Sequence, residues 1–375
     1  MSAAAPLGLY LHIPFCQSIC SYCNFNRGLL DENLKSRYLE ALAAEVRRAG
    51  DGSRVDTIYF GGGTPSLLEP DEVQCLLEAC DAGFELDDTV EVSFEVNPET
   101  ATPARLRGWL DAGVNRLSFG VQSFHNAELK RLGRRHSAER ARDAFVAARA
   151  AGCSNVSLDL MLWLPAQTRA DCRASVETLV GLDPDHASLY ILELYPNSPL
   201  REEMERGSWS LAPDEDAAAM YLDALRITDA AGYEQYEISN VAKIGHRCRH
   251  NLKYWQDGEW LGFGCGAHST RAGCRWKNLS ETDRYIDAVW EEVSVDRRSL
   301  SVEERLGDAL ITGLRLTDGV DLDWVKRRYG VDVINRHRPA LQGFEETGLV
   351  VHNAGRLRLT RSGMLLANEV MSTFV

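Results

Sequence analysis

The sequence has no uncharged apolar segment long enough to span a membrane, no repeat of solenoid period and no low-complexity segment. Basic residues are the minority, since 41 lysines and arginines stand against 55 aspartates and glutamates, a net charge of −14. This balance opposes a broad nucleic-acid-binding face, so we expect no nucleic-acid partner and at most peripheral membrane contact. The segment Met1–Leu9 has no basic stretch before an apolar run, and hence no secretory leader is expected. A cytoplasmic protein with reduced thiols is the natural interpretation.

Three of the ten cysteines, Cys16, Cys20 and Cys23, fall in one short segment with the spacing C-x3-C-x2-C. Three thiolates in one loop can hold a single inorganic cluster, but they are one ligand short of the four that iron–sulfur clusters usually take. One iron would therefore stay open to another ligand. Ordinary buried thiols or a disulfide pair are the alternative interpretation.

Short apolar runs alternate with helix-period segments over residues 7 to 196, a pattern that is typical of repeated βα units around a parallel sheet. The expected strands are Leu7–Ile13, Asp56–Gly62, Val90–Asn97, Arg116–Gln122, Asn155–Leu164 and His186–Leu194. Helix-period stretches such as Ser36–Arg48 and Ala138–Ala150 lie between them, and Pro70 and Pro103 mark helix starts. The predicted fold class is α/β, a partial (βα)6 barrel.

Polar residues and glycines follow or end these strands: the cysteine loop, then Gly61–Pro65, Glu95 and Gln122. Asp159 lies within the fifth strand at a depth that the sequence does not define. The carboxyl ends of parallel strands share one face of a barrel, where loops converge on a site. The sequence therefore predicts one site at that face, next to the cysteines.

The rest of the chain is less regular. A helix is expected near Asp214–Ala231, and the run Tyr233–Ile238 could extend the sheet. From residue 301, expected helices precede a hairpin around Asn353–Gly355, as in a winged-helix-like domain. We divide the chain into a barrel (1–240), an extension (241–300) and this C-terminal domain (301–375), which we interpret as a docking or lid domain. Gly262–Ser269 is expected to be a turn, because no helix follows as a dinucleotide-binding motif requires.

The cysteine loop, the Gly61-Gly-Gly-Thr-Pro65 turn, Glu95 in Phe-Glu-Val-Asn-Pro and Gln122 in Phe-Gly-Val-Gln-Ser resemble the radical S-adenosylmethionine (SAM) superfamily. The resemblance implies a [4Fe–4S] cluster on Cys16, Cys20 and Cys23, SAM at its open iron, and reductive cleavage of SAM. It also implies a set of SAM-contacting positions, which are Tyr10, Tyr22, Gly62, Gly63, Thr64, Glu95, Gln122, Arg134 and Asp159. For Arg134 the alternative is a solvated basic loop, Lys130–Arg135.

Within the superfamily the chain is most similar to the branch of oxygen-independent coproporphyrinogen III dehydrogenase (HemN) and the HemW haem chaperones. The dehydrogenase motif continues to a fourth cysteine where this chain has Phe25, and the long N-terminal extension of the dehydrogenase is absent before Tyr10. His250-Asn-Leu-Lys-Tyr254-Trp255 matches the HemW motif H-N-x-x-Y-W, which is associated with haem binding. The resemblance makes His250 the candidate haem ligand, and a hydrogen-bonded structural histidine is the alternative.

Three functions follow as hypotheses. The first is a radical SAM haem chaperone that binds haem and delivers it to acceptor haemoproteins, with an electron donor such as flavodoxin or ferredoxin. The second is the dehydrogenase, which decarboxylates two propionates of coproporphyrinogen III oxidatively to give protoporphyrinogen IX. The third is a cluster-bearing binding protein with a vestigial SAM site. No side chain is assigned a catalytic role, because the cofactors carry the chemistry.

Overall fold

The computed structural model describes residues 5–196, 198–207 and 209–375. Its central feature is a curved sheet, in which twelve strands are found within those residues, in the order β14-β13-β12-β11-β1-β4-β5-β6-β7-β8-β10-β9. The middle strands run parallel to one another from β11 to β8. They are β11 (Trp260–Phe263), β1 (Leu7–Ile13), β4 (Arg54–Gly62), β5 (Glu85–Val96), β6 (Arg116–Gln122), β7 (Val156–Leu162) and β8 (His186–Ile191).

Antiparallel strands extend the parallel core at both edges, so the described barrel is open. One edge carries β10 (Asn240–Ala242) and β9 (Glu234–Glu237). The other carries β12 (His268–Arg271), β13 (Cys274–Asn278) and β14 (Ser294–Ser299). A separate parallel pair, β2 (Phe15–Cys16) and β3 (Gly28–Leu29), flanks the cysteine loop.

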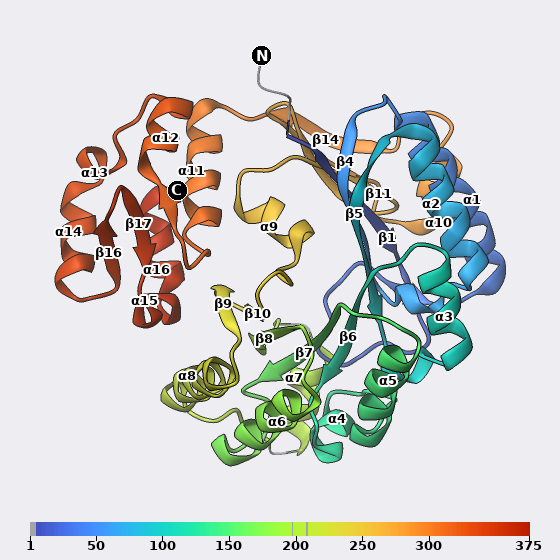
Figure 1. Ribbon diagram of the computed structural model, residues 1–375, viewed down its shortest axis with the longest axis horizontal. Coiled ribbons are helices and arrows are strands. Elements are labelled where there is room, and N and C mark those ends of the chain that lie inside the picture. Colours follow the sequence, from blue (N-terminus) through green and yellow to red (C-terminus); the bar gives the residue numbers. More distant parts are fainter. Residues whose placement is uncertain (1–4, 197, 208) are drawn as a thin grey trace.

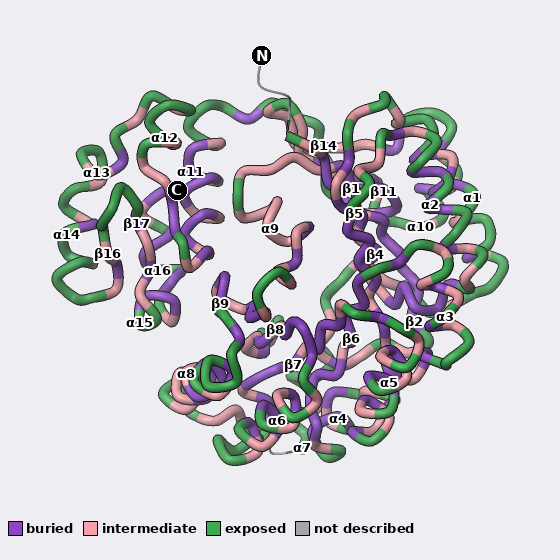
Figure 2. Tube along the Cα trace, in the orientation of Figure 1, coloured by how far each residue is buried: buried purple, intermediate pink, exposed green. Residues whose placement is uncertain are grey.

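Helices cover the outer face of the sheet (Figure 1). They are α1 (Glu32–Ala49), α2 (Pro70–Gly83), α3 (Pro103–Asp111), α4 (Asn126–Arg131), α5 (Ala138–Ala150), α6 (Arg169–Leu182), α7 (Pro199–Gly207), α8 (Asp214–Ala230) and α10 (Thr282–Ala288). Pro70 and Pro103 begin α2 and α3 as expected, because proline suits the first turn, where the N–H has no partner within the helix. Figure 2 shows the parallel strand β1 buried almost throughout, as are most of β4 and the second half of β5, which explains their largely apolar sequences there.

The predicted partial (βα)6 barrel is confirmed, with its six expected strands in β1, β4, β5, β6, β7 and β8. The expected turn at Gly262–Ser269 is correct only for residues 264–267, because the first two residues belong to β11, which pairs in parallel with β1, and the last two to β12. Packing requires a glycine at position 262, since a Cβ there would lie 2.3 Å from the backbone oxygen of His268 in β12. A glycine in a strand marks such a close backbone approach as often as it marks a turn.

The last part of the chain has its own core and follows the expected order of helices and hairpin. Its helices are α11 (Val302–Gly313), α12 (Leu322–Tyr329), α13 (Val333–Arg336), α14 (Arg338–Glu346), α15 (Arg361–Leu365) and α16 (Ala367–Met371). Strands β15 (Val320–Asp321), β17 (Arg356–Leu359) and β16 (Val350–Asn353) form a small antiparallel sheet. A separate cluster of buried side chains from Leu306 to Phe374 holds this unit together. The winged-helix-like C-terminal domain is thus confirmed.

Helix α9 (Arg249–Trp255) differs from the outer helices, because it lies between the sheet and the C-terminal domain (Figure 1). It carries the H-N-x-x-Y-W segment. No helix among the described residues is both long and apolar enough to cross a membrane.

Candidate cluster and cofactor site

The cysteine loop lies at the carboxyl end of β1. Cys16 ends β2 and is buried, while Cys20 and Cys23 follow in the loop and are partly exposed. All three thiols are free. Burial raises the pKa of Cys16 and Cys23, and repulsion between the neighbouring thiols raises it further. The positive charge of bound iron would offset that repulsion and hold the sulfurs as thiolates.

The donor set of this loop fits an iron–sulfur cluster, which takes thiolate ligands. Among the residues that the structure describes, no three His, Cys, Asp or Glu side chains are arranged around one metal position. A [4Fe–4S] cluster takes each thiolate on a different iron and so suits sulfurs that are spread around a larger group. Arg27 donates to the backbone oxygen of Cys23, and Arg134 donates to Cys20 Sγ at 3.6 Å. These cations would partly balance the charge of a thiolate-bound cluster.

The glycine turn after β4 lets the cysteine loop approach the sheet closely. A Cβ on Gly63 would lie 2.8 Å from the oxygen of Phe15 and 3.0 Å from that of Ile13. Gly62 has φ +117°, and a Cβ there would meet the ring of His12 at 2.6 Å. Thr64 follows and donates to Cys16 Sγ at 3.4 Å. The glycines are therefore required for packing as well as for exposing backbone groups to a ligand.

Two half-buried carboxylates, Glu95 on β5 and Asp159 on β7, face the barrel interior. Glu95 accepts hydrogen bonds from Tyr59 Oη at 2.9 Å and from the backbone N–H of Gly62 at 3.3 Å. Burial raises its pKa to about 7, with Asp159 adding to the rise and the two hydrogen bonds opposing it. Asp159 accepts from Ser118 Oγ at 3.1 Å, and burial raises its pKa also. Both groups are acceptors for an ammonium or a ribose hydroxyl.

Gln122 and Arg134 complete this face. Gln122 ends β6 with φ +69° at an irregularity in the pairing with β7, and its Oε1 accepts from Tyr190 Oη at 2.6 Å. Such a bulge turns a side chain at the end of a strand toward the site. The guanidinium of Arg134 donates to Gly120 O and to Asn97 Oδ1, both at 2.7 Å. These contacts oppose the solvated-loop alternative for Arg134.

The structure thus brings the expected SAM-contacting residues of β1, β4, β5, β6 and β7 to the barrel interior and its carboxyl face. Three further residues, which the sequence motifs do not indicate, hold them there: Tyr59, Asn97 and Tyr190. Tyr59 could have been found, because it shares the inward face of β4 with Gly61, two residues away. Asn97 and Tyr190 reach the site through tertiary contacts that no local pattern predicts.

His250 lies away from this face. It is 1% exposed, its Nδ1 is 2.9 Å from Thr57 Oγ1, and its Nε2 is 2.8 Å from Tyr254 Oη. Burial lowers the pKa of His250 to about 3, so the ring is neutral at physiological pH. With both nitrogens hydrogen-bonded, neither is available to haem iron in this structure. The contacts agree with the structural-histidine alternative.

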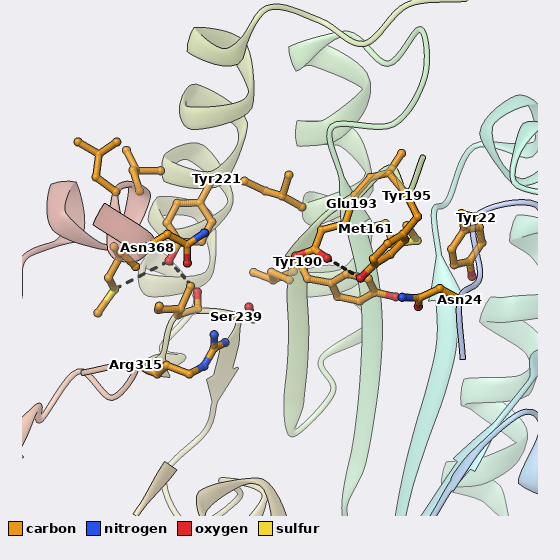
Figure 3. A pocket seen from close by; sticks show the side chains of 18 of the residues that line it. Tyr22, Asn24, Met161, Tyr190, Glu193, Tyr195, Tyr221, Ser239, Arg315 and Asn368 are labelled. Atoms are coloured by element: carbon orange, nitrogen blue, oxygen red, sulfur yellow. Dashed lines mark hydrogen bonds between the residues drawn. The ribbon is translucent and has the colours of Figure 1, made fainter. Parts of the chain in front are cut away.

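A cavity of about 700 Å³ opens beside the cysteine loop, between β8, α8 and the helices α15 and α16. Figure 3 shows Tyr22 and Asn24 at one side and Tyr221, Arg315 and Asn368 at the other, with Tyr190 between them. Its volume lies within the range of cofactor and small-molecule sites. The apolar part of the lining includes Met161 and Phe25, and Phe25 is 63% exposed. The cavity can thus take a large, mostly apolar ligand in contact with the cluster loop.

Two family models match the chain: the radical SAM superfamily over residues 10–179 and the HemN C-terminal domain over residues 300–366. Curated relatives match nearly the whole chain. The heme chaperone HemW of Bacillus subtilis is 36% identical over 373 residues, covering 98% of both proteins. The heme chaperone HemW of Haemophilus influenzae is 31% identical over 394 residues, covering 100% of this chain and 99% of the relative.

One mitochondrial relative and one solved structure also match most of the chain. Radical S-adenosyl methionine domain-containing protein 1 of Danio rerio is 35% identical over 85% of this chain and 75% of its own length. The solved structure of coproporphyrinogen III oxidase (HemN) from Escherichia coli superposes with a TM-score of 0.85 over 99% of this chain and 90% of that one. At 23% identity, the second match establishes the shared fold alone.

Proposed function

Because the chain belongs to the HemW family of the radical SAM superfamily, we propose that it is a haem chaperone, which binds haem and delivers it to acceptor haemoproteins. The observation that carries the proposal is the similarity to HemW proteins along the whole chain, from the cysteine loop to the C-terminal domain. Phe25, where the dehydrogenase pattern has a fourth cysteine, supports the same assignment.

Cys16, Cys20 and Cys23 hold the [4Fe–4S] cluster in this proposal, and SAM binds next to it. When bound, the cluster and SAM supply one-electron reduction and a carbon-centred radical. The chain's own residues bind and orient: Arg134 pairs with the SAM carboxylate, while Glu95 and Asp159 accept from its ammonium or ribose hydroxyls. The remaining SAM contacts are Tyr10, Tyr22, Gly62, Gly63, Thr64 and Gln122. An electron donor such as flavodoxin or ferredoxin would reduce the cluster.

Haem is assigned to the cavity beside the cluster loop rather than to His250. The cavity offers aromatic surfaces from Tyr190 and Tyr195, the apolar side chain of Met161, and the Arg315 guanidinium for a propionate. Haem in this position would touch both the cluster loop and the C-terminal domain. A change at the cluster or a movement of that domain could then release it.

The test is anaerobic reconstitution followed by two assays on the same preparation. The proposal predicts stable haem binding in an optical titration, transfer of that haem to an apo-haemoprotein, and no conversion of coproporphyrinogen III in the presence of SAM and reductant. Formation of protoporphyrinogen IX would instead favour the dehydrogenase, whose fold the chain shares. Haem transfer without release of 5′-deoxyadenosine by the reduced protein would favour a vestigial SAM site.

A further inference from the structure

Helix α9 docks against the amino-terminal parts of β4 and β5, away from the cluster loop. The carboxylate of Glu91 on β5 accepts from the backbone N–H groups of Arg249 and His250, both at 3.2 Å. Asp56 on β4 pairs with Lys253 Nζ at 2.6 Å and with the Arg249 guanidinium at 3.3 Å. These charged contacts fix the position of α9 along the strands.

The backbone of β1 leaves room for this docking at one residue. A Cβ on Gly8 would lie 2.9 Å from Lys253 Cδ and 3.0 Å from both His250 Cε1 and Thr57 Oγ1. These distances are shorter than ordinary van der Waals contacts, so a larger residue at position 8 would require the Lys253, His250 or Thr57 side chain to shift. Gly8, Thr57 and Glu91 are register partners on adjacent strands, and together they form the layer on which α9 rests.

The next layer toward the cluster consists of Tyr10 and Tyr59, which are also register partners. The Tyr59 ring stacks on His250 with a centroid distance of 5.2 Å, and on Tyr10 at 6.2 Å. Its hydroxyl then reaches Glu95 Oε1 at 2.9 Å. A continuous series of contacts therefore leads from α9 to the carboxylate that the proposed function assigns to SAM.

We infer that His250 is a positioning residue of the SAM site, which acts through Tyr59 on Glu95, and that it does not ligate haem. Thr57 and Tyr254 fix the imidazole through its two nitrogens, and the flat face of the ring supports Tyr59. Tyr59 in turn holds one oxygen of Glu95, while the N–H of Gly62 holds the other. The H-N-x-x-Y-W segment thereby supports the SAM site from behind, through the contact of His250 with Tyr59.

The inference rests on the proposed SAM site but does not depend on haem transport. If His250 moved to ligate haem iron, at least one of its two hydrogen bonds would break. Its ring, of which 1% is now accessible, would become exposed. The movement would also leave a buried hydroxyl, either Thr57 Oγ1 or Tyr254 Oη, without this partner. Such losses make ligation from this position costly.

The test compares SAM affinity with haem affinity in anaerobically reconstituted variants. For His250→Ala we expect SAM binding to weaken by about tenfold, the effect of losing one or two well-ordered contacts, with haem affinity within about twofold of the wild type. His250→Phe, which retains a ring against Tyr59, should recover part of the loss. His352→Ala, an exposed histidine in β16, is the matched control and should change neither affinity.

Tyr59→Phe removes only the hydroxyl that reaches Glu95, and it keeps the test valid if His250→Ala does not fold. It should weaken SAM binding and leave haem binding intact. Loss of haem affinity or of the haem spectrum in His250→Ala, with normal SAM binding, would overturn the inference. Normal SAM binding by Tyr59→Phe would also overturn the inference. Failure of the wild-type protein to bind haem would contradict the proposed function but not this role of His250.

Discussion

At the scale of single residues, Glu95 is the group whose ionisation should control the cofactor site. Its pKa of about 7 arises because burial outweighs the hydrogen bonds from Tyr59 and Gly62. The ionised carboxylate is the better acceptor for an ammonium or a hydroxyl, and it predominates only above that pKa.

We therefore predict that SAM affinity increases as the pH rises from 6 to 8, with a midpoint near pH 7. Tyr59→Phe should move the midpoint upward, because the lost hydrogen bond favours the ionised form. Isothermal titration calorimetry over this range measures both effects. A flat profile, or a midpoint that Tyr59→Phe leaves in place, would show that Glu95 does not titrate at the SAM site.

Gly63 gives a second prediction at this scale. The methyl group of Gly63→Ala would collide with backbone oxygens of Ile13 and Phe15, so the cysteine loop must shift at a cost of about 1–3 kcal/mol, and iron binding should fall. Iron and sulfide content after reconstitution is the measurement. Gly181→Ala in α6, where a Cβ meets no atom within 4 Å, is the control and should keep the full iron content. Equal iron content in both variants would contradict the packing role of Gly63.

The convergence of the motif residues on one face could be predicted from sequence, because the carboxyl ends of parallel strands meet at the same face. The environment of His250 could not be predicted from sequence, since its burial and its hydrogen bonds to Thr57 and Tyr254 depend on how α9 docks on β4. A histidine next to aromatic residues looks the same in sequence whether its nitrogens are free or hydrogen-bonded.

At the scale of elements, the parallel strands were predictable because strands buried on both faces have continuous apolar sequences. Strand β11, which lies between β1 and β12, was not predictable, since Gly262 and Gly264 are typical turn residues. Gly264 does adopt φ +95°, but Gly262 makes room for the backbone of His268 in the neighbouring strand β12. The sequence therefore located a turn correctly in part and missed the strand that precedes it.

One ion pair between the barrel and the C-terminal domain involves a carboxylate that is fully buried. Arg315, which follows α11, donates to Glu237 of β9 at 2.9 Å, and the Glu237 side chain is 0% exposed. Removing one partner of a buried pair leaves an uncompensated charge. Arg315 also packs over the Trp255 ring of α9 at 4.3 Å.

Arg315→Met should lower the free energy of unfolding by about 3 kcal/mol, measured by urea denaturation. Arg298→Met, which breaks the exposed pair with Glu304, should lower it by less than about 1 kcal/mol. Similar losses in the two variants would contradict the structural role of the Arg315–Glu237 pair.

At the scale of the whole molecule, the cavity beside the cluster loop joins parts that lie far apart in sequence. Its walls come from the cysteine loop, from β8 and α8, and from α15 and α16. No local pattern reveals such a cavity, although the sequence did predict the barrel and the C-terminal domain that form it. The account therefore rests on the claim that haem occupies this cavity and leaves it for an acceptor.

Haem transfer to an apo-haemoprotein, measured with wild-type protein and with Ser239→Trp, tests that claim most directly. Ser239 lines the cavity and is half-buried, so an indole there would fill space that haem needs. We predict that the wild type binds and transfers haem, whereas Ser239→Trp does neither and still binds its cluster and SAM. Equal transfer by the two proteins would exclude the cavity as the haem site, and no transfer by the wild type would contradict the chaperone function.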